Sequence, residues 1–252
     1  MSAHQGSNHV PSVAVVIPTI GKETVLKAID SVYEQSYPDI KIHLVIDGPE
    51  YVEVVRSLNP HIFKDQFIAV TQLGENVGAA PGGPFYGHRV YAASPHITNA
   101  DYVFFLDEDN WYKPNHVASL VELCERHRLD WAFSFRSVYA DDEFVCDDRC
   151  ESLGFWPVWN GQFNGIHYHV DTSTYCFRRT FLIGTSFVWH WGYAADRRFF
   201  GAINNLENKY GTTAEHTMCY RVDGNENSVK TDFFIEGNKK TAHITFAERA
   251  TK

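Results

Sequence analysis

The sequence has no long apolar run and no long run of basic residues. Its first eleven residues are polar and lack the apolar stretch of a secretory signal. No later segment approaches the roughly 20 apolar residues that span a bilayer. The formal net charge is −9, whereas nucleic-acid-binding proteins usually carry a basic stripe. We therefore expect a cytoplasmic protein with no transmembrane segment and no nucleic-acid partner, in which surface aromatics leave room for peripheral contact with the inner face of a membrane.

Cysteine motifs are also missing. The five cysteines are odd in number and no two of them have Cys-x-x-Cys spacing, which fits a reduced compartment. Cys146 and Cys150 are close enough in sequence for a local bridge or a metal pair. We favour free thiols over both alternatives.

The familiar nucleotide-binding glycine motifs are absent as well. The loop over residues 74–84 is rich in glycine and proline, but it contains neither Gly-x-Gly-x-x-Gly nor a Lys-Ser/Thr pair. No internal repeat, low-complexity tract or clear linker divides the chain. With 44% hydrophobic residues, a sizeable core is expected. We therefore predict a polar tail over residues 1–11 and a single domain over residues 12–252.

What the chain does contain is an alternation of β-branched runs with segments of helical periodicity. Strands are expected over residues 13–17, 40–46, 67–70, 103–106, 131–135 and 172–177, and helices over 21–35, 50–58, 85–94, 111–128 and 197–206. We expect a hairpin and a loop within 138–159, an edge strand over 216–222 and a polar tail over 224–252. The strand–helix order predicts an α/β fold with a parallel, doubly wound sheet.

One predicted strand ends in acidic residues. Val103–Leu106 is apolar on both faces, as expected of a buried strand, and Asp107-Glu108-Asp109 follows directly. Ligands of open α/β sheets bind at such strand ends. Asp107 and Asp109 are two residues apart and would share a side in extended chain. Mg²⁺ or Mn²⁺ held by carboxylates and substrate phosphates would relieve their repulsion. The alternative is a solvated acidic turn.

Several landmarks now occur in a characteristic order. They are the Val16–Thr19 strand end, Asp47-Gly48, Asn76-x-Gly78, Asp107-x-Asp109, and Asp196 before an aromatic, arginine-containing helix. Over roughly residues 12–210 this order resembles the family-2 glycosyltransferases with the GT-A fold. The resemblance implies a Rossmann-like, three-layer α/β/α sandwich with a mostly parallel central sheet. Residues 12–110 would form the nucleotide-binding half and residues 111–252 the acceptor-binding half.

The resemblance also implies ligands and donor-site residues. The donor would be a nucleotide sugar, with UDP the favoured nucleotide, and the acceptor a glycan or glycolipid. Pro18 and Thr19 would line the nucleotide pocket, and Asp47 would meet the base. The remaining donor-site candidates are Asn76 and Gly78, which would border the base and ribose, and Arg89, which lies near the position of an arginine that the family often keeps beside the diphosphate.

The same resemblance assigns the catalytic residues of an inverting transfer. Asp107 would contact the ribose or the metal, Asp109 would bind Mn²⁺ or Mg²⁺ directly, and Asp196 would be the general base. The family sometimes adds a histidine ligand from the C-terminal segment. Our candidate is His243, with His216 and His190 as alternates.

The sequence departs from the family pattern at three places. Ile20-Gly21 follows Pro18-Thr19 where a polar or acidic residue is common, and Ala79–Gly87 is longer than usual, which weakens the match of Arg89. Ala195 precedes Asp196 where the family often has a glutamate.

Two groups in the second half have two interpretations each. The tryptophans at 156, 159, 189 and 191 could stack on sugar rings or belong to the core. Arg178-Arg179 could meet an anionic acceptor such as a lipid diphosphate, although a solvated pair is the simpler interpretation.

Two other functions compete with sugar transfer. A nucleotidyltransferase of similar architecture would make the activated sugar, but the single glycine and lysine after the first strand match its glycine-rich loop poorly. A non-catalytic binding module would keep the fold without the chemistry.

Overall fold

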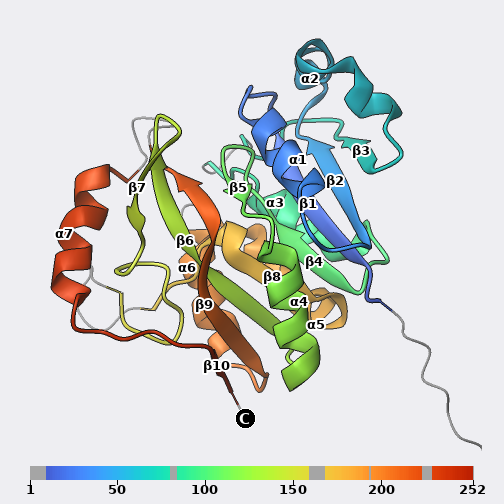
Figure 1. The fold of residues 1–252 in the computed structure, drawn as a ribbon. Coiled ribbons are helices and arrows are strands. Elements are labelled where there is room, and N and C mark those ends of the chain that lie inside the picture. Colours follow the sequence, from blue (N-terminus) through green and yellow to red (C-terminus); the bar gives the residue numbers. More distant parts are fainter. Residues whose placement is uncertain (1–9, 80–83, 159–167, 193, 223–228, 252) are drawn as a thin grey trace, which may run out of the picture.

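The computed structural model describes residues 10–79, 84–158, 168–192, 194–222 and 229–251. Nearly all of the predicted N-terminal tail lies outside these ranges. A single sheet with the strand order β10-β9-β6-β8-β4-β1-β2-β3 organises the chain (Figure 1).

The first half of the chain forms the parallel side of the sheet. Its strands are β1 (Val13–Thr19), β2 (Ile40–Ile46), β3 (Ile68–Gln72) and β4 (Tyr102–Phe105). The helices between them are α1 (Val25–Tyr33), α2 (Val52–Leu58) and α3 (His88–Ala93). β1 lies between β2 and β4, and all seven of its residues are buried, as expected for a parallel strand covered on both faces.

The second half extends the same sheet with mixed pairing. β6 (Trp131–Ala140) and β9 (Tyr210–Arg221) are parallel, and the antiparallel strand β8 (Tyr175–Arg178) joins β6 to β4. Three short strands pair at the margins: β5 (Trp111–Tyr112), β7 (Glu143–Asp147) and β10 (Arg249–Ala250). The helices are α4 (His116–His127), α5 (Arg179–Thr185), α6 (Ala195–Asn204) and α7 (Thr231–Thr241).

Helices cover both faces of the sheet, so a large hydrophobic core lies on each face. Adjacent residues of one strand point to opposite faces. Val15 and Phe104 therefore pack in one core with residues of α1 and α4. Val16 and Phe105 pack in the other with residues of α3 and α6. This arrangement confirms the α/β class and the three layers expected from the sequence.

Several sequence-based boundaries need correction. The strand predicted over 172–177 begins only at Tyr175, because Thr172–Thr174 forms a 3-10 helix capped by Asp171. The helix expected over 111–128 begins only at His116, because Trp111 and Tyr112 pair with β9 instead. The predicted edge strand over 216–222 is part of the longer β9, which lies between β6 and β10. The predicted polar tail contains α7, which packs against β6 and β7 (Figure 1).

Two further expectations agree with the structure. The hairpin predicted within 138–159 is the β6–β7 pair, and all five cysteines are free thiols. Among the helices of the described residues, none is long and apolar enough to cross a bilayer.

Candidate active site

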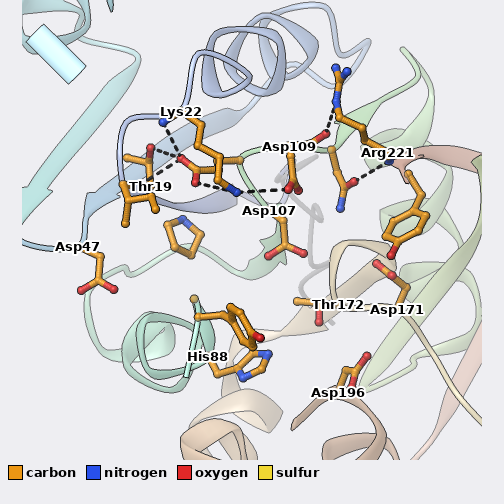
Figure 2. A pocket seen from close by; sticks show the side chains of 17 residues that line it. Thr19, Lys22, Asp47, His88, Asp107, Asp109, Asp171, Thr172, Asp196 and Arg221 are labelled. Atoms are coloured by element: carbon orange, nitrogen blue, oxygen red, sulfur yellow. Dashed lines mark hydrogen bonds and ion pairs between the residues drawn. The ribbon is translucent and has the colours of Figure 1, made fainter. Parts of the chain in front are cut away.

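A cavity of about 440 Å³ opens where β1, β2 and β4 end. Its lining runs from Asp47, after β2, past Asp107 and Asp109, after β4, to Asp171 and Asp196 in the second half of the chain. Figure 2 shows these five carboxylates around one space. Ligands of α/β sheets bind at such strand ends, and the volume lies within the range of small-molecule sites.

The loop after β1 is held in place by Glu108. This buried carboxylate accepts a hydrogen bond of 2.6 Å from the Thr19 hydroxyl and two more from the backbone N–H groups of Ile20 and Lys22, at 3.2 and 3.3 Å. Burial raises the pKa of Glu108, and the Thr19 and Lys22 contacts oppose that effect. The middle acid of Asp107-Glu108-Asp109 therefore shapes the cavity wall.

The two outer acids face the cavity. Asp107 accepts hydrogen bonds from the hydroxyls of Tyr91, at 2.6 Å, and Ser173, at 3.2 Å. Burial, and then the charge of Asp109, raises the pKa of Asp107 to about 7. The Lys22 ammonium lies 3.6 Å from Asp109 and 3.6 Å from Glu108 (Figure 2). One lysine only partly relieves the repulsion between the carboxylates of Asp107 and Asp109. This pair is therefore suited to a further cation.

Asp47 forms the far end of the cavity. Its two oxygens accept the backbone N–H groups of Val77 and Gly78, at 2.8 and 2.9 Å. Burial raises the pKa of Asp47, and these two hydrogen bonds oppose the rise. The carboxylate is thereby fixed with free lone pairs available to a donor in the cavity.

Asp196 lies in the first turn of α6. One of its oxygens accepts the backbone N–H of Arg197 at 2.7 Å, and the other lies 3.4 Å from Nε2 of His169. Burial is the main cause that raises the pKa of Asp196 to about 6, and the charge of Asp171 adds to it. A carboxyl group with such a pKa is a base suited to neutral pH.

Asp171 lies between the acids after β4 and Asp196, along the cavity (Figure 2). Its side chain accepts the N–H of Ser173 at 2.9 Å at the start of the short 3-10 helix Thr172–Thr174. Ser173 in turn contacts Asp107, as described above. The second oxygen of Asp171 pairs with the buried guanidinium of Arg136 on β6. β6 and the 3-10 helix before β8 thus help to orient Asp107, the acid that follows β4.

Not every predicted residue reaches the cavity. Pro18, Thr19, Asp47, Asp107, Asp109 and Asp196 line it. Asn76 and Gly78 stand behind Asp47: the amide of Asn76 accepts the N–H of Ala79 at 2.9 Å, and Gly78 donates to Asp47. The Arg89 guanidinium instead lies 3.6 Å from the centre of the Phe85 ring and donates to the carbonyl of Val77. Arg89 is therefore held away from the cavity lining.

The histidine ligand predicted from the C-terminal segment is also not brought to the acids. His243 is exposed after α7 and does not line the cavity. Of the alternates, His216 contacts the carbonyl of Asp148, and His190 is exposed. Among the described residues, no group of three histidine, cysteine or acidic side chains is arranged to hold a metal alone.

The tryptophans divide between the two interpretations. Trp189 is fully buried and stacks on Phe199, and Trp156 packs edge-on against Phe135. Trp191 is 53% exposed, and Trp159 lies outside the described residues. The two arginines at 178 and 179 are engaged locally, Arg178 with Glu125 and Arg179 with the carbonyl of Pro95.

Sequence reasoning missed several residues of the site. Lys22, His88, Asp171 and Arg221 line the cavity, and His169 contacts Asp196 from behind it. Asp171 precedes Thr-Ser-Thr, which is a usual start for a helical turn, but that signal says nothing about a cavity. Some partners of these residues lie more than one hundred positions away in the chain.

Comparisons with known proteins give a family match. A model of glycosyl transferase family 2 matches residues 14–191. A search of curated proteins gave no match.

Solved structures of TarS from S. aureus share the fold. TarS 1–349 in complex with UDP has 14% identity and a TM-score of 0.60, and the match covers 84% of this chain and 60% of that one. The same protein in complex with UDP-GlcNAc gives 15% identity and a TM-score of 0.58, with 92% and 65% covered. This chain thus spans less than two thirds of these TarS chains, and the likeness supports the GT-A fold. With the family match over most of its length, the chain belongs to glycosyl transferase family 2.

Proposed function

We propose that the chain is an inverting, metal-dependent glycosyltransferase that uses a UDP-sugar, with a hexose or an N-acetylhexosamine as the transferred group. The acceptor is a hydroxyl of a glycan or glycolipid. The observation that carries the proposal is the order of groups along one cavity: Asp47, the pair Asp107 and Asp109, and then Asp196. The TarS complexes with UDP and UDP-GlcNAc support the choice of donor.

The donor set fits a hard divalent cation. Mg²⁺ and Mn²⁺ take oxygen ligands, and Mg²⁺ typically binds one or two carboxylates together with substrate phosphates. Asp109 and Asp107 supply such carboxylates, and the lack of a three-residue metal cluster among the described side chains is consistent with a site completed by the diphosphate. When bound there, the cation would stabilise the negative charge that develops on the departing diphosphate.

The chain's own residues divide the remaining tasks. Asp47, fixed by two backbone N–H groups, accepts a hydrogen bond from the uracil base. Asp196 takes the proton of the acceptor hydroxyl as its oxygen attacks the sugar carbon. Attack from the face opposite the diphosphate inverts the anomeric centre, with oxocarbenium character in the transition state, as in glycoside chemistry generally. Tyr91 and Ser173 hold Asp107 against rotation.

Calorimetry with UDP and UDP-GlcNAc, with and without Mn²⁺, tests the proposal. We expect Mn²⁺ to tighten nucleotide binding, and Asp109→Asn to remove that increase because one carboxylate ligand is lost. Asp30→Asn is the matched control, since Asp30 is exposed on α1 and outside the cavity. Equal Mn²⁺ enhancement in the Asp109 variant and the control would contradict the metal assignment.

Turnover separates the rival functions. A transferase releases UDP from a UDP-sugar, whereas a nucleotidyltransferase releases pyrophosphate from UTP and a sugar phosphate. A binding module would bind UDP without either reaction. We expect slow, metal-dependent UDP release from UDP-GlcNAc in water even without an acceptor.

A further inference from the structure

His169 is a buried histidine that contacts the proposed base from outside the cavity. The residue is 2% exposed, and Nε2 lies 3.4 Å from Oδ2 of Asp196. Its backbone carbonyl accepts the N–H groups of Leu153 and Gly154, at 3.1 and 2.9 Å. The backbone of His169 is therefore held by contacts that do not involve Asp196.

The surroundings of His169 keep its ring neutral. Burial holds the pKa of His169 well below its ordinary value, and the nearby guanidinium groups of Arg197 and Arg136 lower it further. A neutral imidazole carries one N–H and one acceptor nitrogen. Which nitrogen carries the proton depends on the partners of the two nitrogens.

Those partners favour one tautomer. Nδ1 is buried and has no hydrogen-bond partner among the described residues, so a proton there would be an unsatisfied buried donor. Nδ1–H would also turn the lone pair of Nε2 toward the carboxylate of Asp196. With the proton on Nε2, the N–H belongs to the nitrogen that lies 3.4 Å from the carboxylate of Asp196.

We propose that His169 is a positioning residue that holds the carboxylate of Asp196 by donating its Nε2–H to Oδ2. The backbone N–H of Arg197 holds Oδ1, so the two donors together fix the plane of the carboxylate. This inference rests on the proposed role of Asp196 as the base. It adds a residue that the motif pattern does not contain, in a chain where Ala195 replaces the usual glutamate before Asp196.

Other charged groups face His169 and Asp196 and also affect the pKa of Asp196. Asp171 and Glu151 raise the pKa of Asp196, and Arg197 lowers it. Glu151 is itself paired with Arg197 at 2.6 Å and with Arg136. Burial, and then the charge of Asp196, raises the pKa of the Tyr175 hydroxyl. A donor at Oδ2 stabilises the ionised form of Asp196 against this acidic background.

NMR of the imidazole nitrogens of the ¹⁵N-labelled full chain tests the contact without donor, metal or turnover. We expect His169 to be the neutral Nε2–H tautomer at pH 8. Its ring shifts should move as Asp196 gains a proton near pH 6, and Asp196→Asn should abolish that movement. His169→Gln identifies the resonances. A ring protonated at Nδ1, or shifts that do not respond to Asp196, would overturn the proposal while leaving the donor site intact.

Variants of His169 supply a second test, with UDP release from UDP-GlcNAc and Mn²⁺ as the readout. His169→Leu removes the hydrogen-bond donor and should lower kcat by about 10- to 100-fold, the range of a hydrogen bond to a charged group. The KM for UDP-GlcNAc should be unchanged. The acid limb of the pH profile should move to higher pH, because the ionised carboxylate has lost a donor.

His169→Gln keeps an N–H and should restore most of kcat. His61→Gln, on an exposed histidine, controls for loss of a histidine elsewhere. If the Leu and Gln variants lost kcat equally with no shift of the pH profile, and their Tm fell together, His169 would have only a packing role.

Discussion

Asp107 and Asp196 are half-buried carboxyl groups of the same cavity with pKa values near neutrality, and their environments suit them to different tasks. The pKa of Asp107 rises to about 7 because of burial and the charge of Asp109, so added positive charge beside it would favour its ionised form. The pKa of Asp196 rises to about 6, mainly through burial. Asp196 has no lysine or arginine side chain bonded to its carboxylate in the described residues, which leaves it able to take up a proton.

This difference predicts the pH dependence of turnover. Asp196 acts as a base only when ionised, and its raised pKa means that the ionised fraction falls as the pH drops through about 6. We expect kcat for UDP release to decrease about tenfold per pH unit well below pH 6. Asp196→Asn should lower kcat by about 10² to 10⁴-fold and remove this limb. A steady-state pH profile of both proteins checks this, and an unchanged limb in the variant would assign it to another group.

The loop between β3 and α3 depends on a glycine beside Asp47. A Cβ added to Gly78 would lie 2.6 Å from the carbonyl oxygen of Tyr86 and 2.8 Å from Oδ2 of Asp47. Both contacts are too short, so the loop or Asp47 must move. The Asn76-x-Gly78 segment does not line the cavity itself. It holds Asp47, which does, in place through its backbone N–H groups.

We expect Gly78→Ala to destabilise the chain by about 1–3 kcal/mol, the usual cost of overpacking, and to weaken UDP binding measurably. Gly74→Ala is the matched control, because a Cβ there meets nothing within 4 Å. Thermal unfolding and UDP calorimetry on both variants measure the two effects. Equal behaviour of the two variants would show that the close approach at Gly78 is unimportant.

Strands and strand ends were predictable where the local pattern is strong. β1, β2 and β4 are apolar runs that end in polar or acidic residues, and Asp47, Asp107 and Asp109 follow them as expected. The helix α7 was missed because its buried residues are few, Phe234 and two small ones, and lie in a polar segment. β9 was only partly predicted because it begins Tyr-Gly-Thr-Thr, which has no apolar alternation.

Apart from Asp196, the second half of the site could not be predicted, because tertiary contacts assemble it. Asp171 reaches Asp107 through Ser173, and His169 reaches Asp196 across 27 positions of chain. Arg89 shows the converse case: its place in the sequence suits a diphosphate ligand, but contact with Phe85 holds it elsewhere. Neither outcome has a local signal.

Arg136 ties several segments of the second half of the chain together. Its buried guanidinium pairs with Asp148 at 2.8 Å, and with Glu151 and Asp171. It also lies 4.2 Å from the ring centre of Tyr220 on β9. One cation from β6 thus balances three acids, one of which lines the cavity.

We expect Arg136→Met to lower the free energy of unfolding by about 3–5 kcal/mol, because it leaves buried carboxylates without their partner. Arg126→Met removes an exposed pair with Glu248 and should cost less than about 1 kcal/mol. Urea denaturation of both variants gives the comparison. A loss for Arg136→Met as small as for the control would mean that the buried acids are satisfied without it.

The proposed transfer depends on a cation and a diphosphate meeting at the acids after β4. The most direct measurement is anomalous diffraction from crystals grown with UDP and Mn²⁺. We predict one manganese peak bonded to an oxygen of Asp109 and to the diphosphate, with the uracil base at Asp47. Ordered UDP with manganese bound away from Asp107 and Asp109, or UDP bound outside this cavity, would contradict the account.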